Sequence, residues 1–148
     1  GMVRPVVLAA LLALSGAPLQ AEEVRQADFA PCSGSARQTC VVDGDTLWLE
    51  GAKIRLADIN TPEVSQPGCA SERALGEAAT RRLIALLNAG PFTLERQGNR
   101  DADRYGRLLR VAMRDGQSLG QVLVAEGLAE TWQGRRSDWC ADGAVAAR

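Results

Sequence analysis

The chain has 148 residues, 46% of them hydrophobic, which is apolar material for one domain with a single core. Its formal net charge of −1 excludes a protein that binds nucleic acid through an overall basic surface, so any such role depends on a local cluster of cations. The sequence contains no histidine, which excludes mechanisms with an imidazole base and leaves carboxylates, arginines and metal for any hydrolytic chemistry.

Residues 1–21 are typical of a secretory signal peptide. A short basic start at Met2-Val3-Arg4 precedes an apolar run from Pro5 to Leu14, which is followed by the small residues Ser15-Gly16-Ala17 and Ala21. The run is shorter than the ~20 apolar residues of a membrane-spanning helix, so we expect export without stable membrane anchoring. Gly1, before the Met, looks like a residue left by cloning.

A polar arm and four cysteines come next. Residues 22–38 contain Gly, Pro and Ser and are expected to form an irregular N-terminal arm, whereas residues 39–148 are expected to form a single domain. Cysteines after an export signal favour disulfides, and no Cys-x-x-Cys pair supports zinc. Of three possible connectivities, we favour Cys32 with Cys40, at the first strand, and Cys69 with Cys140, which ties down a C-terminal tail.

Five strands are predicted from apolar and β-branched runs between turn signals. They lie at 39–42, 46–50, 53–57, 92–96 and 108–114. In the third strand, Ile54 and Leu56 are predicted to share one face, with Arg55 on the other. Residues 58–68 contain two prolines and are predicted to form a loop.

Two helices are predicted. The first begins at Ser71, expected to be its cap, and ends at about Asn88, before Gly90. Its apolar stripe comprises Leu75, Ala78, Ala79, Leu83, Leu86 and Leu87. The second is short and follows Ser118. This order predicts a mainly β, α+β chain: a five-stranded oligonucleotide-binding (OB) barrel with one helix between strands three and four and another after strand five. Such barrels bind nucleic acid on one face, although a fold alone assigns no activity.

Four polar motifs occur within or next to these predicted elements. They are Asp43-Gly44-Asp45-Thr46, Arg55, Asn60-Thr61-Pro62-Glu63 and Asp103-Arg104-Tyr105-Gly106-Arg107. Each motif alone is explained by an ordinary turn, and neither Asp43 nor Asp101 begins an EF-hand. Together they suit a hard cation and a phosphate, because carboxylate and amide oxygens bind the first and arginine forks bind the second.

Six arginines also fall within residues 96–114. They are Arg96, Arg100, Arg104, Arg107, Arg110 and Arg114. For most of them we favour a solvated strand face over a role in binding.

In combination and in order, these motifs resemble the staphylococcal nuclease family, the thermonucleases. The resemblance spans about residues 39–132 and includes Val41–Thr46, Ile54–Leu56, Thr61–Glu63, Asp103–Arg107 and Glu126–Ala129. It implies a nuclease that uses one calcium ion. With the signal peptide, we expect an exported protein, secreted or periplasmic, and a monomer. The substrates would be single- and double-stranded DNA and RNA, cleaved to leave 3′-phosphates and 5′-hydroxyls.

The resemblance also implies a role for each matching residue. Asp45, Asn60 and the backbone carbonyl of Thr61 would bind the metal, with Asp43 as a carboxylate behind them. Glu63 would position or deprotonate the attacking water, and Arg55 and Arg107 would grip the phosphate. The nucleotide would be contacted by Arg104, Tyr105 and Trp132.

One position departs from the family pattern. Asn60 stands where these enzymes usually carry a second calcium aspartate, and we therefore expect weaker metal binding and lower activity. Asp58 is expected to be a solvated edge charge rather than its replacement. The first alternative is an OB-fold nucleic-acid-binding module with impaired catalysis, and the second is a disulfide-stapled exported domain without a nucleic-acid role.

Overall fold

The computed structural model describes residues 1–5 and 22–141, so most of the expected signal peptide lies outside the described residues. The sheet begins with an antiparallel meander of β1 (Cys40–Asp43), β2 (Thr46–Leu49) and β3 (Ala52–Leu56). Strand β2 ends one residue earlier than predicted, because Glu50 adopts a left-handed φ of 50° in the turn to β3.

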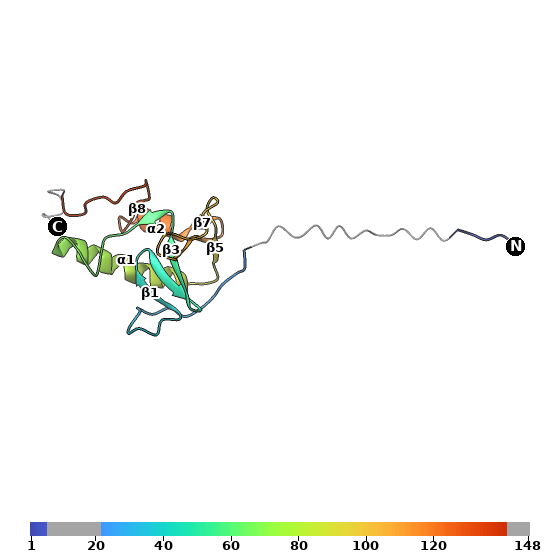
Figure 1. The fold of residues 1–148 in the computed structure, drawn as a ribbon, viewed down its shortest axis with the longest axis horizontal. Coiled ribbons are helices and arrows are strands. Elements are labelled where there is room, and N and C mark those ends of the chain that lie inside the picture. Colours follow the sequence, from blue (N-terminus) through green and yellow to red (C-terminus); the bar gives the residue numbers. More distant parts are fainter. Residues whose placement is uncertain (6–21, 142–148) are drawn as a thin grey trace.

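The rest of the chain completes the predicted α+β order (Figure 1). Helix α1 (Ala70–Asn88) precedes β5 (Thr93–Glu95) and β6 (Leu108–Arg114), and β7 (Gln117–Ser118) leads into helix α2 (Leu119–Ala125). The strand order is β1-β2-β3-β6-β5, with β3 and β6 parallel and β7 added beside β6. This OB-like arrangement confirms the predicted fold class. No helix among the described residues is long and apolar enough to cross a membrane.

A second, two-stranded sheet was not predicted. It pairs β4 (Ile59–Asn60), inside the predicted loop, with β8 (Glu130–Thr131), near the C-terminal tail. These strands are two residues long, too short to leave an alternating pattern in the sequence. Their pairing nevertheless brings the segment before Glu63 against the tail.

Helix α1 begins differently from the prediction. Its first residue is Ala70, Cys69 occupies the N-cap position, and Ser71 lies inside the first turn, so Ser71 is not the cap. The predicted end at Asn88 is confirmed. The side chains that α1 contributes to the core are Ala79, Leu83, Leu86 and Leu87, whereas Leu75 and Ala78 are half-buried.

The N-terminal arm lies along two edges of the sheet. Its Arg25 exchanges backbone hydrogen bonds with Phe92, next to β5, and further along Val41 of β1 donates to Ala30. Between these points Phe29 is buried in the core, and Asn88 binds both backbone polar groups of Phe29. The arm therefore links the free edges of β1 and β5, which would otherwise expose unpaired backbone.

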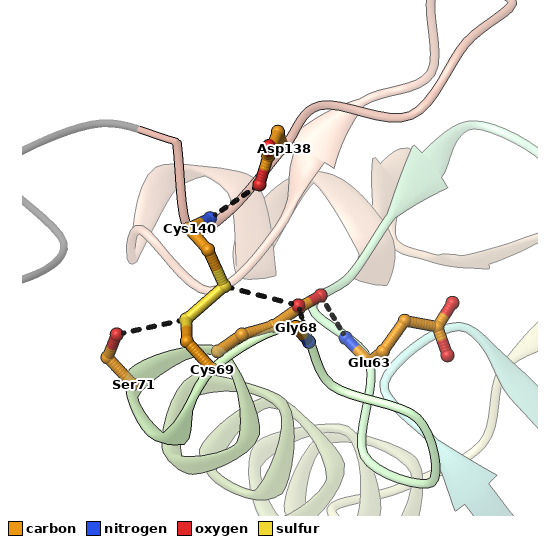
Figure 2. Close-up of a disulfide and its surroundings, with 7 residues drawn as sticks. Glu63, Gly68, Cys69, Ser71, Asp138 and Cys140 are labelled. Atoms are coloured by element: carbon orange, nitrogen blue, oxygen red, sulfur yellow. Dashed lines mark hydrogen bonds between the residues drawn. A yellow bond between two sulfur atoms is a disulfide. The ribbon is translucent and has the colours of Figure 1, made fainter.

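Both disulfides favoured from the sequence are present, and the described residues include no free cysteine. Cys32–Cys40 ties the arm to β1, and Cys69–Cys140 ties the tail to the start of α1 (Figure 2).

Candidate active site

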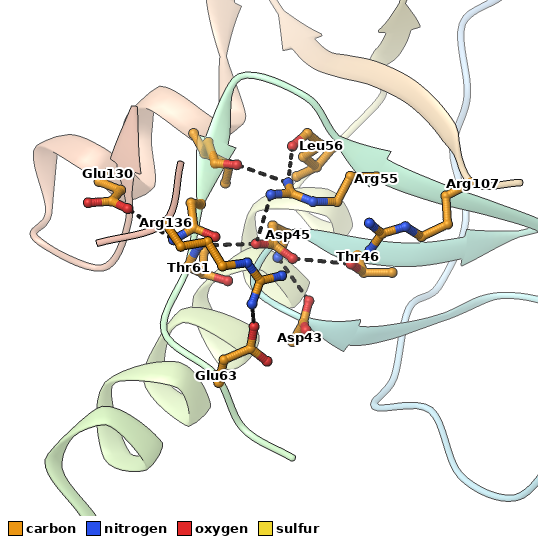
Figure 3. A network of polar contacts seen from close by, with 12 residues as sticks. Asp43, Asp45, Thr46, Arg55, Leu56, Thr61, Glu63, Arg107, Glu130 and Arg136 are labelled. Carbon is orange, nitrogen blue, oxygen red and sulfur yellow. Dashed lines mark hydrogen bonds and ion pairs between the residues drawn. The ribbon is translucent and has the colours of Figure 1, made fainter. Parts of the chain in front are cut away.

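Asp45 lies at the centre of a buried polar network (Figure 3). It lies in the turn between β1 and β2 and is only 5% exposed. Its Oδ1 accepts a hydrogen bond from Thr46 Oγ1 (3.1 Å), and its Oδ2 accepts one from the backbone N–H of Thr61 (3.1 Å). The same Oδ2 lies 3.5 Å from Nη2 of Arg55. Segments from β2, β3 and the end of β4 thus meet at one carboxylate.

Gly44 allows this close approach. A Cβ at this position would lie 2.7 Å from Thr61 Cγ2 and 2.8 Å from the Cβ of Ala79 in α1. The Asp-Gly pair that signals a turn in the sequence is therefore also required for packing.

Asp43 stands behind Asp45 and accepts a hydrogen bond from its backbone N–H (3.2 Å). Burial, together with the negative charge of Asp45, raises the pKa of Asp43 to about 7. Two neighbouring carboxylates of this kind favour a nearby cation, which would relieve their repulsion.

Arg55 is buried, at 7% exposed, together with its neighbours Ile54 and Leu56. The sequence predicted that Arg55 lies on the strand face opposite Ile54 and Leu56, and in the structure both faces are covered. Its Nη1 donates to the carbonyl oxygens of Leu56 and Ile59, the latter at 2.9 Å. Burial lowers the pKa of Arg55, and the negative charge of Asp45 partly opposes this effect. The guanidinium stays a cation, and its hydrogen bonds to the two carbonyl oxygens fix its position.

Asn60 is almost fully buried, at 1% exposed, and faces Glu130 across the β4–β8 pair. Its Nδ2 donates to Glu130 Oε1 at 3.0 Å. Its Oδ1 and the Oγ1 of Thr61 are both buried and have no hydrogen-bond partner among the described residues. Burial tends to raise the pKa of Glu130, but hydrogen bonds from Ser137 and Asn60 lower it overall, so this carboxylate stays ionised.

Glu63 is held in place through its backbone. The buried carboxylate of Glu72, in the first turn of α1, accepts hydrogen bonds from the N–H of Glu63 (3.0 Å) and of Gly68 (2.7 Å) (Figure 2). This fixes both ends of the loop, while the side chain of Glu63 is left to form an ion pair with Arg136 of the tail (Figure 3).

The loop before β6 presents the other cationic group. Asp103 accepts hydrogen bonds from the backbone N–H groups of Tyr105 and Arg107 (both 3.0 Å) and from Arg107 Nε (2.7 Å). Burial raises the pKa of Asp103, but the bonds from Arg107 and Tyr105 outweigh it and the pKa is lowered. Arg104 Nη2 donates to the hydroxyl of Tyr105 (2.6 Å), whose ring is 68% exposed.

Arg55, Tyr105 and Arg107 belong to the lining of a cleft of about 590 Å³. It is lined by Arg55, Ala57, Arg100, Asp103, Arg104, Tyr105, Arg107, Leu109, Trp132 and Arg136. Five of these residues are arginines, and Asp103 is the only acid among them. Such a cleft suits a polyanion with aromatic or heterocyclic rings, which would stack on Tyr105 or Trp132.

The predicted site residues separate into two groups in the structure. Asp43, Asp45, Asn60 and Thr61 form the buried network, and Arg55, Arg104, Tyr105, Arg107 and Trp132 line the cleft beside it. Glu63 reaches the cleft through its ion pair with Arg136.

The prediction that Asp58 is a solvated edge charge was wrong. Its Oδ2 accepts a hydrogen bond from Ser118 Oγ (2.5 Å) at the start of α2.

The arginine cluster is also divided. Arg100, Arg104 and Arg107 line the cleft, whereas Arg110 pairs with Asp101 (2.8 Å) and Arg114 donates to the carbonyl of Gly90 (2.7 Å). No local pattern in the chain selects Glu72, Glu130 or Arg136 as site residues. Their partners lie 9, 70 and 73 positions away in the chain, and only the fold brings them together.

The oxygens around Asp45 form a small donor set for a cation. The described residues hold no group of three or more His, Cys, Asp or Glu side chains placed for a metal. However, the unpartnered Asn60 Oδ1 and Thr61 Oγ1 are buried oxygens in the same network as Asp45, and a hard cation binds such oxygens. The residues present therefore fit a site with one carboxylate, neutral oxygens and water.

Comparison with known proteins agrees with this geometry. The family model described as "Staphylococcal nuclease homologue" matches residues 53–142. The chain is 37% identical over 92 residues to Endonuclease YncB and to SPbeta prophage-derived endonuclease YokF, both of Bacillus subtilis (60% of this chain; 43% and 31% of theirs). It is 34% identical over 98 residues to the succinoglycan biosynthesis protein ExoI of Rhizobium meliloti (62% of this chain, 49% of that protein). The matched region thus spans a third to a half of these relatives.

Proposed function

The chain belongs to the staphylococcal nuclease homologue family, and from this premise we propose that it hydrolyses phosphodiester bonds of DNA and RNA. The observation that carries the proposal is the arginine-lined cleft, which adjoins both the buried Asp45 network and Glu63. The names of the two Bacillus subtilis relatives, both endonucleases, support it.

Each residue has a distinct part in the proposed reaction. Arg55, fixed by carbonyl oxygens and Asp45, and Arg107, fixed by Asp103, would bind the nonbridging oxygens of the phosphate. Both cations are already oriented, so they can meet the negative charge that develops in the transition state without reorganisation. Glu63 would accept the proton of the attacking water, and the leaving group would be the 5′-oxygen, which leaves a 3′-phosphate.

We propose one calcium ion as the cofactor. Asp45, Asn60 and Thr61 would hold it, as supported by the two buried oxygens that lack partners. When bound, calcium would supply positive charge next to the reacting phosphate. With an amide at position 60, one negative charge is missing, so we expect calcium binding and activity to be weaker than in a site with two aspartates.

The substrate would be contacted by aromatic rings as well as arginines. The exposed rings of Tyr105 and Trp132 are offered to bases in the same cleft, and stacking of this kind tolerates any base. We therefore propose little sequence preference. We also propose that the protein acts on single and double strands and is a monomer. The two disulfides support a secreted or periplasmic location.

A cleavage assay tests this function. Plasmid and single-stranded DNA are incubated with the protein in calcium or in chelator, and cleavage is expected only in calcium. Glu63→Gln should abolish it, and Arg107→Ala should lower the rate by ~100-fold or more, as for a lost oxyanion donor. Matched controls are Glu77→Gln and Arg73→Ala, an exposed ion pair on α1, which should cleave like the wild type.

The competing function is a nucleic-acid-binding module in which Asn60 has removed catalysis. The specific observation in its favour is that the amide at 60 already has a protein partner, Glu130. Single-stranded DNA that is bound but uncut at every calcium concentration would establish this alternative and overturn the nuclease.

A further inference from the structure

The C-terminal tail brings an arginine into the cleft from outside the motifs of the family. Arg136 is one of the five lining arginines, and its guanidinium pairs with the carboxylate of Glu63. Figure 3 shows Arg55, Arg107 and Arg136 directed toward the space beside Asp45, from β3, the loop before β6 and the tail respectively.

Three contacts hold the tail, one before Arg136 in the sequence and two after it. The N–H of Trp132 donates to the carbonyl of Asp58 (2.9 Å), and the N–H of Ser137 donates to Glu130 Oε1 (2.9 Å). Beyond these, Cys140 is joined to Cys69 at the start of α1. An exposed surface arginine would normally sample many positions, but these ties keep Arg136 at the cleft.

The ion pair with Glu63 is suited to exchange. The side chain of Arg136 is 52% exposed and that of Glu63 is 29% exposed, and an ion pair in contact with water contributes little stability. A phosphodiester that enters the cleft offers oxygens to the same guanidinium in a bidentate arrangement.

We propose that Arg136 is a further phosphate-binding residue, which pairs with Glu63 in the free protein and transfers to the phosphate of the substrate. The transfer releases the Glu63 carboxylate only when substrate is present. This inference rests on the proposed function for the meaning of Glu63, but the binding step itself does not require that the phosphate be cleaved.

Binding measured without cleavage tests the proposal. The dissociation constant of a short fluorescent single-stranded oligothymidylate is measured in chelator for the wild type, Arg136→Ala, Arg136→Lys and the neighbouring Arg135→Ala. Arg135 is exposed and is not among the described residues that line the cleft. Arg136→Ala should bind about tenfold more weakly, because a hydrogen-bonded charge pair is lost. Arg136→Lys should bind with intermediate affinity and Arg135→Ala within about twofold of wild type.

The exchange with Glu63 is tested by a double-mutant cycle. Glu63→Gln should tighten oligonucleotide binding several-fold, because Arg136 no longer has a competing partner. In the Arg136→Ala background this gain should shrink to the smaller effect of removing one negative charge. An equal gain in both backgrounds would show that Arg136 and Glu63 act independently and would overturn the proposal.

The outcomes separate this inference from the nuclease function. If the wild type cleaves DNA in calcium but Arg136→Ala binds as tightly as wild type, the nuclease stands and the role of Arg136 is wrong. If the wild type never cleaves DNA but the binding cycle shows the expected coupling, Arg136 is a phosphate ligand of a binding module. A higher cleavage rate of Arg136→Ala with unchanged affinity would make the tail an inhibitory strap and would also overturn the proposal.

Discussion

The pair formed by Asn60 and Glu130 explains why a neutral residue is tolerated in the polar network. The amide donates to the Glu130 carboxylate through Nδ2, which turns its unpartnered Oδ1 in another direction. A carboxylate in place of this amide would put two negative charges about 3 Å apart, one at the buried residue 60 and one at the half-buried Glu130. The identity of residue 60 is therefore linked to the carboxylate at residue 130.

This linkage predicts that Asn60→Asp alone destabilises the folded protein, although it adds a carboxylate for calcium. In chelator, the single variant should lose ~2 kcal/mol of unfolding free energy, the cost of a broken buried hydrogen bond and a new charge repulsion. Asn60→Asp with Glu130→Gln should recover most of that loss and bind calcium more tightly than the wild type. Urea denaturation and calcium titration calorimetry are the measurements. A stable single variant with tighter calcium binding would refute the linkage.

At the residue scale, the sequence identifies side chains with a fixed local motif and misses those that depend on tertiary contacts. Asp45, Arg55 and Arg107 occur in short motifs whose order is visible in the chain. Glu130 and Arg136, in contrast, lie in a segment without a periodic pattern, and their positions depend on the β4–β8 pair and a disulfide. No local rule relates them to Asn60 or Glu63.

At the scale of elements, the contact of α1 with the loop after β4 positions Glu63. Gly76 lies on the buried face of α1, and a Cβ there would be 2.7 Å from the carbonyl oxygen of Pro62 and 2.9 Å from Val64 Cγ2. The backbone oxygen cannot move away without shifting the loop. Glycine is thus kept in a helix interior where its conformational freedom is otherwise a disadvantage.

Gly76→Ala should therefore be destabilising despite the higher helix propensity of alanine. The gain of ~1 kcal/mol from propensity should be exceeded by the cost of displacing the loop, and cleavage should fall because Glu63 moves with it. Thermal unfolding and the plasmid assay measure both effects. An alanine variant that is more stable than the wild type and fully active would show that the loop adapts freely.

The loop before β6 depends on one ionised carboxylate, which gives it a defined response to acid. The folded-state pKa of Asp103 is lowered, so its contribution to stability is complete above its unfolded pKa of 3.8 and is lost as the pH falls through the lower folded value. Asp103→Asn should lower stability at pH 7 and flatten its decline in acid below about pH 4. Urea unfolding across pH 2–7 measures this, and parallel curves for both proteins would contradict it.

Regular elements were predictable in proportion to their length. The seven-residue β6 matches its predicted bounds, because a mostly apolar run between two glycine-containing turns leaves a clear signal. The start of α1 was misplaced, since Ser71 looks like a cap but Cys69 is fixed outside the helix by the bond to Cys140. A covalent constraint from a distant residue determined that boundary instead of local propensity.

At the scale of the whole molecule, charge is concentrated rather than abundant. The chain carries a net charge of −1, yet the cleft gathers five arginines against one acid. Binding of a polyanion is therefore a property of how the fold gathers residues from β3, the loop before β6 and the tail. The tail that contributes Arg136 to this assembly is joined to the start of α1 by Cys69–Cys140.

The two disulfides should accordingly differ in what their loss does. Cys69–Cys140 closes a loop of 71 positions and Cys32–Cys40 one of 8, so chain entropy predicts losses of about 4 and about 2.5 kcal/mol of unfolding free energy. The pair Cys69→Ser/Cys140→Ser should also weaken oligothymidylate binding in chelator as Arg136→Ala does, because the tail is released. The matched pair Cys32→Ser/Cys40→Ser should reduce stability and leave that affinity unchanged. Urea unfolding and fluorescence titration separate the two effects, and equal affinities for both double variants would show that the tail stays in place without its disulfide.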